Sequence, residues 1–170
     1  KNLNYIYKRV FDYTAALTGL ILLSPLFIII SVLVKLTSPG KVLFKQIRIG
    51  KDGKPFMFYK FRSMYFNSEE SNEREAFMKD FIMNDISMHP GSTKIVNQKN
   101  VTKIGKFLRK TSLDELPQLF NVIKGDMSLV GPRPCLSYEY EIFDDWHKRR
   151  NSVMPGCTGV WQVSGRSSVS

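Results

Sequence analysis

The feature that most constrains this chain is an uncharged, apolar stretch near its start. No residue from Tyr13 to Val34 carries a charge, and about 20 apolar residues are enough for a helix to cross a bilayer. Pro25 lies near the middle of the stretch. A proline cannot donate to the carbonyl of Ile21 and clashes with it, so a helix must bend there. The hydroxyl of Ser24 can bond back to the Leu20 carbonyl and ease the bend.

Positive residues flank this stretch on both sides. They are Lys8 and Arg9 before it, and Lys35, Lys41, Lys45 and Arg48 after it. Positive charge marks the cytoplasmic side of a membrane segment. The residues alone leave two arrangements open: a kinked transmembrane helix, or a helical hairpin with its elbow at Ser24-Pro25 and arms of about 10 residues that each reach about 15 Å. A signal peptide fits less well. The apolar core of a signal peptide is shorter than this stretch and is followed by a small-residue cleavage site, and neither feature is present here. A buried helix of a soluble protein also fits less well, because no other part of the chain is apolar enough to surround it.

The composition adds a strong positive charge to this picture. The 170 residues suit a single domain and include 25 Lys and Arg against 15 Asp and Glu, a formal charge of +10. A partner or substrate with negative charge is therefore expected: nucleic acid, anionic lipid or a phosphorylated molecule. Cys135 and Cys157 are too few for a disulfide framework. Together with His89 and His147 they do not make a zinc site at normal ligand spacing.

The remainder of the chain alternates short strand and helix patterns. Residues 42–48 and 55–61 read as two strands joined by the turn signal at 50–54. The predicted helix at 101–110 is expected to face inward with Ile104, Phe107 and Leu108. The predicted helices cover 68–88, 101–110, 115–124 and 138–150, and a short extended segment covers 127–130.

Two adjacent carboxylates, Asp114 and Glu115, open one predicted helix. Ser112 and Glu115 match a capping box, although Pro117 would then occupy an unfavourable helical position. With Asp114 as the N-cap, Pro117 falls in the first turn, where proline is tolerated. Capping alone therefore predicts a structural role for the pair.

Basic residues near turns favour a chemical role instead. Arg binds phosphate oxygens through paired hydrogen bonds, and Lys supplies a point charge. An Asp–Glu pair also suits Mg²⁺, which prefers oxygen ligands, and an Asp can attack phosphorus to form an acyl phosphate. The basic residues placed to converge on the pair are Lys60, Arg62, Arg109 and Arg133.

Four segments resemble the bacterial sugar transferase family, the monotopic phosphoglycosyl transferases that begin glycan assembly on undecaprenyl phosphate. Asp-Glu-Leu-Pro-Gln, followed by Gly-Asp-Met-Ser-Leu-Val-Gly-Pro-Arg-Pro, is highly specific for that family. The matching segments, in family order, are Lys60–Met64, Ser112–Leu119, Lys124–Pro134 and Pro155–Arg166.

The resemblance implies a fold and a location. We expect an α+β fold, mainly helical, with a re-entrant N-terminal membrane helix-hairpin at residues 1–40. A small cytosolic catalytic domain at residues 41–170 would carry a β-hairpin and amphipathic interfacial helices. The membrane bend falls on Ser24 and Pro25, which favours the hairpin over the spanning helix. The expected location is the bacterial inner membrane, with the active site facing the cytoplasm.

The resemblance also implies a mechanism. Asp114 would attack the β-phosphate of a UDP-sugar, UMP would leave, and undecaprenyl phosphate would take the sugar phosphate. Glu115 would pair with Asp114, and both would help to hold Mg²⁺. Direct attack by the lipid phosphate is the competing route. The basic residues expected at the substrate phosphates are Lys60, Arg109, Arg133 and Arg166.

Three departures from the family pattern stand out. Met154 replaces a basic residue, and residues 97–100 replace a segment that often reads Asp-x-Arg. Members also usually continue with amphipathic helices past Gly165-Arg166, so we expect those C-terminal helices to be missing here. The sugar, the glycan (capsule, exopolysaccharide, O-antigen or glycoprotein) and the oligomeric state stay open, a homo-oligomer included.

Two other classes of function compete with the transferase. A non-catalytic basic scaffold at the membrane surface explains the charge and the apolar stretch, but gives Asp114 and Glu115 no task. A nucleic-acid-binding module is permitted by a pI near 9.7. However, no nucleic-acid motif is present, so no nucleic-acid partner is expected.

Overall fold

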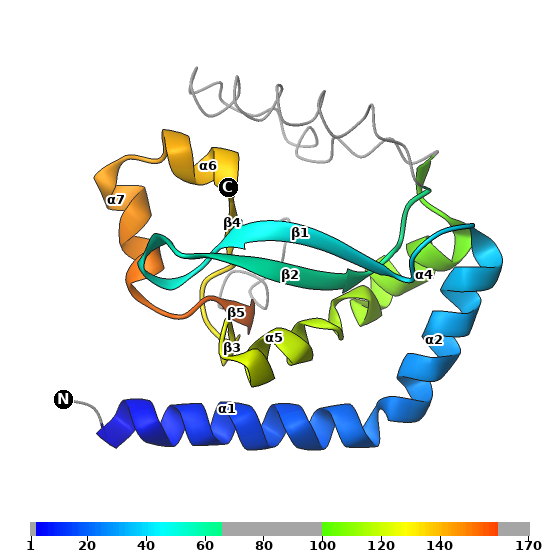
Figure 1. Cartoon of the computed structure of the whole chain (residues 1–170), viewed down its shortest axis with the longest axis horizontal. Helices are drawn as coiled ribbons and strands as arrows, with labels where there is room; N and C mark the ends of the chain where they lie inside the picture. Colours follow the sequence, from blue (N-terminus) through cyan, green and yellow to red (C-terminus); the bar gives the residue numbers. More distant parts are fainter. Residues whose placement is uncertain (1–2, 66–99, 160–170) are drawn as a thin grey trace.

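The computed structural model describes residues 3–65 and 100–159 (Figure 1). The predicted helix 68–88, and Arg166, lie outside these residues. Short 3-10 turns occur at Lys51–Gly53, Leu113–Glu115 and Arg149–Ser152. In chain order the helices and strands are α1 (Leu3–Leu22), α2 (Ser24–Thr37), β1 (Leu43–Ile49), β2 (Pro55–Phe61), α4 (Lys103–Thr111), α5 (Gln118–Lys124), β3 (Ser128–Val130), β4 (Cys135–Leu136), α6 (Ser137–Ile142), α7 (Asp145–Lys148) and β5 (Gly156–Thr158).

The apolar stretch forms two helices with a bend where proline predicted one. Helices α1 and α2 meet at an angle of 63°. Pro25 lies in the first turn of α2, where its missing N–H does no harm. The Ser24 hydroxyl donates to the Ile21 carbonyl at 2.8 Å, and not to Leu20 as expected. Within the described ranges no single helix is long and apolar enough to cross a membrane, although the bent pair together has the length and composition to do so.

The predicted β-hairpin is confirmed. Strands β1 and β2 pair antiparallel from Leu43↔Phe61 to Ile49↔Pro55. Their connection uses the positive φ of Asp52 (56°) and Gly53 (73°), a conformation that Gly adopts freely and Asp tolerates. Strand β4 extends the sheet on the other side of β1, while β3 and β5 form a separate parallel pair.

Helix α5 covers the free edge of β2 through one side chain. Asn121 is fully buried. Its side-chain oxygen accepts from the Tyr59 N–H at 3.2 Å, and its amide nitrogen donates to the Met57 carbonyl at 2.6 Å. The Asn121 amide therefore takes the place of a further strand and fixes α5 beside the sheet.

Two apolar clusters tie the bent helices to the sheet. Ala16 of α1 packs with Phe58, Val122 and Met127. Ile30 and Val34 of α2 pack in a second cluster with Phe61 and Leu108. Figure 1 shows the result: α1 runs beneath α5 and the hairpin, and α2 rises along one side of them.

A buried carboxylate also holds α1 in place. Asp12 is 2% exposed and accepts from the Ser128 hydroxyl (2.7 Å), the Leu129 N–H (3.1 Å) and the Lys8 ammonium (3.1 Å). Arg9 donates to the Met127 carbonyl at 3.1 Å. Lys8 also donates to the Ser128 hydroxyl, so Lys8 and Arg9, expected only as flanking charges, both join α1 to the segment around β3.

Two helix predictions need correction. Phe107 is 54% exposed and does not face inward. Gly105 packs against the Ser63 backbone and so marks the inner face of α4. Two residues further on, Phe107 lies about 200° around the helix from Gly105 and therefore points outward. The helix predicted at 138–150 is broken into α6, α7 and a 3-10 turn, because Phe143 is extended and Asp144 caps α7 by accepting from the His147 N–H.

Candidate active site

The carboxylate pair lies in a tight turn between two short helices. Ser112 ends α4 with a left-handed φ of 59°, and Asp114 and Glu115 follow in the 3-10 turn. Neither predicted capping arrangement forms. The Ser112 side chain makes no capping hydrogen bond to this turn, and the N-cap of α5 is Pro117. Asp114 is thus not the N-cap of α5, and the Ser112 hydrogen bond of the capping box is missing.

Lys60 of β2 reaches both carboxylates. Its ammonium lies 3.0 Å from Glu115 Oε1 and 3.8 Å from Asp114 Oδ2. Asp114 is only 6% exposed. Burial raises the pKa of Asp114 above its usual value, while the charge of Lys60 opposes the rise and Glu115 adds to it. Lys60 is therefore the main cation that keeps this buried carboxylate ionisable.

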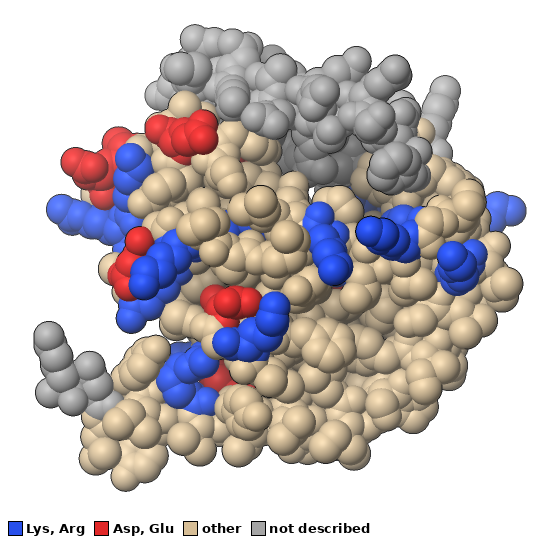
Figure 2. Space-filling model, viewed as in Figure 1, with Lys and Arg blue, Asp and Glu red and all other residues tan. Residues whose placement is uncertain are grey.

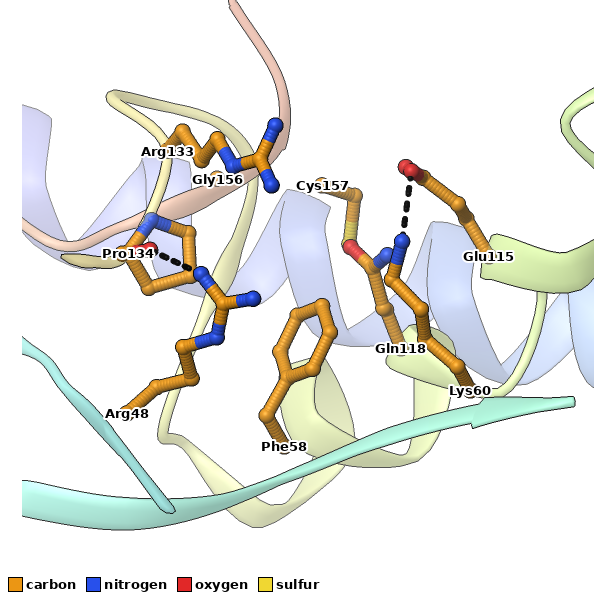
Figure 3. Close-up of a pocket in the computed structure, with 9 residues that line it drawn as sticks. All are labelled: Arg48, Phe58, Lys60, Glu115, Gln118, Arg133, Pro134, Gly156 and Cys157. Carbon is orange, nitrogen blue, oxygen red and sulfur yellow. Dashed lines mark hydrogen bonds and ion pairs between the residues drawn. The ribbon is translucent and has the colours of Figure 1, made fainter. Parts of the chain in front are cut away.

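A pocket opens beside this cluster, between the hairpin, the start of α5 and the segments around β4 and β5 (Figure 3). Three of its side chains are cations and one is a carboxylate, so the pocket suits an anion. Figure 2 shows the wider setting: basic side chains gather across the middle of one face, and the lower rim, where α1 runs, is mostly uncharged. The lining residues are Arg48, Phe58, Lys60, Glu115, Gln118, Arg133, Pro134, Gly156 and Cys157.

The predicted phosphate-binding residues separate into three groups. Lys60 and Arg133 line the pocket. Arg109 does not line it, but its positive charge lowers the pKa of Asp114, and its guanidinium lies 3.6 Å from the Met64 sulfur. Arg166 lies outside the described residues.

Arg62, also expected to converge on the carboxylates, points elsewhere. Its guanidinium donates to the carbonyls of Ser38 (2.7 Å) and Pro39 (2.6 Å), at the end of α2. A cation at a helix C-terminus is favourable because the last carbonyls have no helical partner. Arg62 is thus a structural link between β2 and α2.

Sequence reasoning missed Arg48 as a site residue. Its side chain shares one face of the hairpin with Phe58 and Lys60, as the pairing register Arg48↔Phe56, Gln46↔Phe58 and Phe44↔Lys60 shows. The alternation of the strand residues was the available signal. It places Arg48 on the same face as Lys60, but does not tell which face meets the carboxylates.

Cys157 lines the pocket without being a nucleophile. Burial, together with the negative charges of Glu115 and Asp12, raises its pKa to about 12. A thiol with that pKa is neutral at physiological pH, and the thiolate is the reactive form. Cys157 therefore forms part of the wall.

The donor set at the turn fits a magnesium ion held jointly with substrate. Within residues 3–65 and 100–159, no group of three His, Cys, Asp or Glu side chains could hold a metal by itself. Mg²⁺, however, is commonly bound by one or two carboxylates plus substrate phosphates. Asp114 and Glu115 supply such a pair, and the anion pocket lies beside them.

The fold and the site together place a lysine-paired carboxylate couple beside a pocket lined by three cations. The chain belongs to the bacterial sugar transferase family, whose model matches residues 3–170. This confirms the family predicted from its four motifs.

Curated relatives agree with this assignment. The chain is 43% identical over 168 residues to a galactosyl transferase, CpsE, of Streptococcus agalactiae, covering 96% of this chain and 35% of the relative. It is 45% identical over 165 residues to an undecaprenyl-phosphate galactose phosphotransferase of Salmonella typhimurium, covering 95% of this chain and 33% of the relative. It is 43% identical over 165 residues to the exopolysaccharide production protein ExoY of Rhizobium meliloti, covering 96% and 71%. The chain thus spans about a third of the first two relatives.

Proposed function

We propose that this chain transfers a sugar-1-phosphate from a UDP-sugar to undecaprenyl phosphate and releases UMP. The observation that carries the proposal is Lys60 contacting the buried Asp114 and its neighbour Glu115 at the edge of a cationic pocket. The names of relatives support it, among them a UDP-glucose:undecaprenyl-phosphate glucose-1-phosphate transferase of Klebsiella pneumoniae, 42% identical over 166 residues. The reaction would begin the membrane stage of a bacterial glycan.

The proposed route has two displacements at one phosphorus. A carboxylate oxygen of Asp114 attacks the β-phosphorus of the UDP-sugar, the bond from that phosphorus to the bridging oxygen breaks, and UMP leaves with the electron pair. An oxygen of undecaprenyl phosphate then attacks the same phosphorus and releases the Asp114 carboxylate. Lys60 orients Asp114 and neutralises charge on the transferred phosphoryl group, with Arg109 adding to the local positive field.

We assign the joint metal site to Asp114 and Glu115 with Mg²⁺. A bound Mg²⁺ would neutralise the charge of the diphosphate. The residues of the chain do the positioning: Glu115 holds the Lys60 ammonium at 3.0 Å, and Arg133, across the pocket from Lys60, would meet the phosphates (Figure 3).

We also propose that the bent helices form a re-entrant hairpin in the cytoplasmic leaflet of the bacterial inner membrane. Their outer surface is rich in exposed apolar side chains, unlike the usual surface of a soluble monomer. Both the basic flanks and the domain would then lie on the same side. Among the exposed side chains are Ile6, Val10, Phe11, Leu17, Ile21, Leu22, Ile28, Ile29, Val32, Leu33 and Leu36.

The decisive experiment is UMP release from a panel of UDP-sugars with undecaprenyl phosphate and Mg²⁺. We expect turnover with at least one sugar, and a loss of at least about 1,000-fold in Asp114→Asn, comparable to removal of other catalytic nucleophiles. UDP-sugar alone should leave a labelled sugar phosphate on Asp114. Product formation without any such adduct in single-turnover trials would favour direct attack by the lipid phosphate.

The same experiment separates the enzyme from the scaffold hypothesis. A scaffold would release no UMP with any sugar and would keep its membrane-surface function in Asp114→Asn. The relatives named above are transferases or polysaccharide production proteins, and their names do not favour a scaffold.

A further inference from the structure

Arg48 combines a buried position with a place on the pocket wall. It is 7% exposed, yet its side chain is one of the three cations that line the pocket. Most buried charges in proteins are paired or hydrogen-bonded, because removing a charge from water is unfavourable. Arg48 is thus a buried cation whose side chain forms part of the pocket wall, and the proposed reaction has so far given it no role.

Several neutral groups hold the Arg48 guanidinium in one orientation. Its NH1 donates to the Pro134 carbonyl at 2.9 Å, and its Nε and NH2 donate to Gln46 Oε1 at 3.2 and 3.0 Å. The group also lies over the Phe58 ring, 5.1 Å from its centroid. These partners fix the geometry of the guanidinium, so Arg48 is held in a defined place on the pocket wall.

The same contacts fix the turn that carries Arg133. Arg48 holds the end of the turn at Pro134. At its start, the Gly131 N–H donates to the Thr158 carbonyl at 2.9 Å, and the Gly156 N–H donates to the Pro132 carbonyl at 2.9 Å. A turn held at both ends leaves the Arg133 side chain at a defined place on the pocket rim. Figure 3 shows Arg48 and Arg133 directed toward the same space.

The pocket is therefore divided into two basic ends. Lys60 and Glu115 lie at one end, next to Asp114, and Arg48 and Arg133 lie at the other, beyond Phe58 and Cys157 (Figure 3). A nucleoside diphosphate sugar has two phosphates. If the phosphorus under attack lies near Asp114 and Lys60, the two arginines are the cations of the pocket left for the other phosphate.

We propose that Arg48, together with Arg133, binds the α-phosphate that departs with the nucleotide. The inference rests on the proposed function and adds a residue and a role to it. When the bond from the β-phosphorus to the bridging oxygen breaks, the electron pair stays on that oxygen, so negative charge grows on the leaving UMP. Two guanidinium groups at that position stabilise this charge, as Arg does in other phosphoryl transfers.

The test compares UMP with uridine in binding to the full chain by calorimetry with Mg²⁺ present. The ratio of the two affinities measures what the phosphate contributes to binding. Loss of hydrogen bonds to a charged group predicts that Arg48→Met reduces this ratio by about 10- to 100-fold. Arg48→Lys, which keeps the charge but not the paired geometry, should fall in between. Arg149→Met removes a guanidinium from the exposed turn Arg149–Ser152 and is the matched control, with an unchanged ratio.

Several results would overturn the inference. Equal weakening of UMP and uridine would mean that Arg48 shapes the nucleoside site or the fold only. An unchanged ratio with a raised KM for undecaprenyl phosphate would assign the arginines to the lipid phosphate. If Arg48→Met does not fold, as its melting temperature will reveal, Arg48→Lys decides. If the wild-type chain neither prefers UMP to uridine nor releases UMP from a UDP-sugar, the proposed function itself is wrong. If the wild type does both and the Arg48 variants keep its UMP-to-uridine affinity ratio, only this inference is wrong.

Discussion

At the scale of single residues, the site depends on a carboxylate in an unfavourable place. Asp114 is almost fully buried, and burial raises its pKa. A nucleophile must be ionised, so the fold has to offset part of the desolvation, and Lys60 at 3.8 Å does so. Stability and chemistry therefore make opposite demands on this side chain.

Replacing Asp114 by Asn should make the protein more stable at neutral pH. A folded-state pKa above the ordinary 3.8 means that ionising Asp114 destabilises the fold, and this penalty is full above the raised pKa and absent below 3.8. Asp114→Asn should thus melt at a higher temperature than wild type at pH 7, with the difference shrinking as the pH falls toward 4. A lower melting temperature at pH 7 would show that the carboxylate is a structural support.

Replacing Lys60 by Met should change the pH dependence of turnover. Without the ammonium the pKa of Asp114 rises further, so the acidic limb of the kcat profile moves to higher pH. Lys60→Arg keeps the charge and should leave the limb near its wild-type position. A uniform loss of kcat with an unmoved limb would indicate that Lys60 acts on the substrate alone.

At the scale of elements, the contact between α1 and β3 joins the apolar helices to the domain with the site. Asp12 accepts three hydrogen bonds there, from Ser128, Leu129 and Lys8. Burial alone would raise the pKa of Asp12, but these hydrogen bonds outweigh it, so its pKa lies below the usual value. The direction is opposite to that of Asp114, and so is the expected effect on stability.

Asp12→Asn should destabilise the fold by about 1–3 kcal/mol at pH 7, the usual effect of leaving buried partners unsatisfied. Because the folded-state pKa is lowered, the contribution of Asp12 is present above 3.8 and is lost as the pH falls through the folded value. Unfolding in detergent should show that the difference in the free energy of unfolding between Asp12→Asn and wild type shrinks at acidic pH. Ser128→Ala, which removes one donor and no charge, should give a smaller loss with little pH dependence. A difference in the free energy of unfolding that is the same at every pH would contradict an ionised Asp12 as the source of the stability.

At the scale of the whole molecule, the described fold rests against the inner sides of α1 and α2, and their outer sides are apolar. The bend of 63° is neither a straight continuation nor a full reversal. The bend lies at Ser24 and Pro25, where the membrane proposal places the elbow of its hairpin. The proposal for the membrane therefore makes a prediction about sidedness.

Cysteines at positions 5 and 41 should label from the same face of sealed vesicles. Tyr5 and Lys41 are both exposed and lie on opposite sides of the bend. The experiment uses a background in which Cys135 and Cys157 are replaced by Ser, and a cysteine at the exposed Lys110 of α4 marks the face of the domain. Labelling of positions 5 and 41 from opposite faces would establish a spanning helix instead.

The sequence by itself determined the features that near neighbours control. Pro25 placed the bend, the turn at 50–54 and its flanking strand residues placed the hairpin, and Gly125, at φ 90°, ended α5. The motifs also gave the family, because their residues and order are specific to it. The bend, the turn and the helix end each depend on residues within a few positions of one another, so local chemistry was sufficient for them.

Only the tertiary structure decided which way the charged side chains face. Arg62 reads like Lys60 in the sequence, yet it binds carbonyls at the end of α2, while Arg48 lines the pocket and Asp12 anchors α1 to β3. These outcomes depend on contacts between segments more than 20 positions apart, and for Asp12 and Ser128 more than 100. Local periodicity fixes the face of an element on which a residue lies, but packing decides what that face meets.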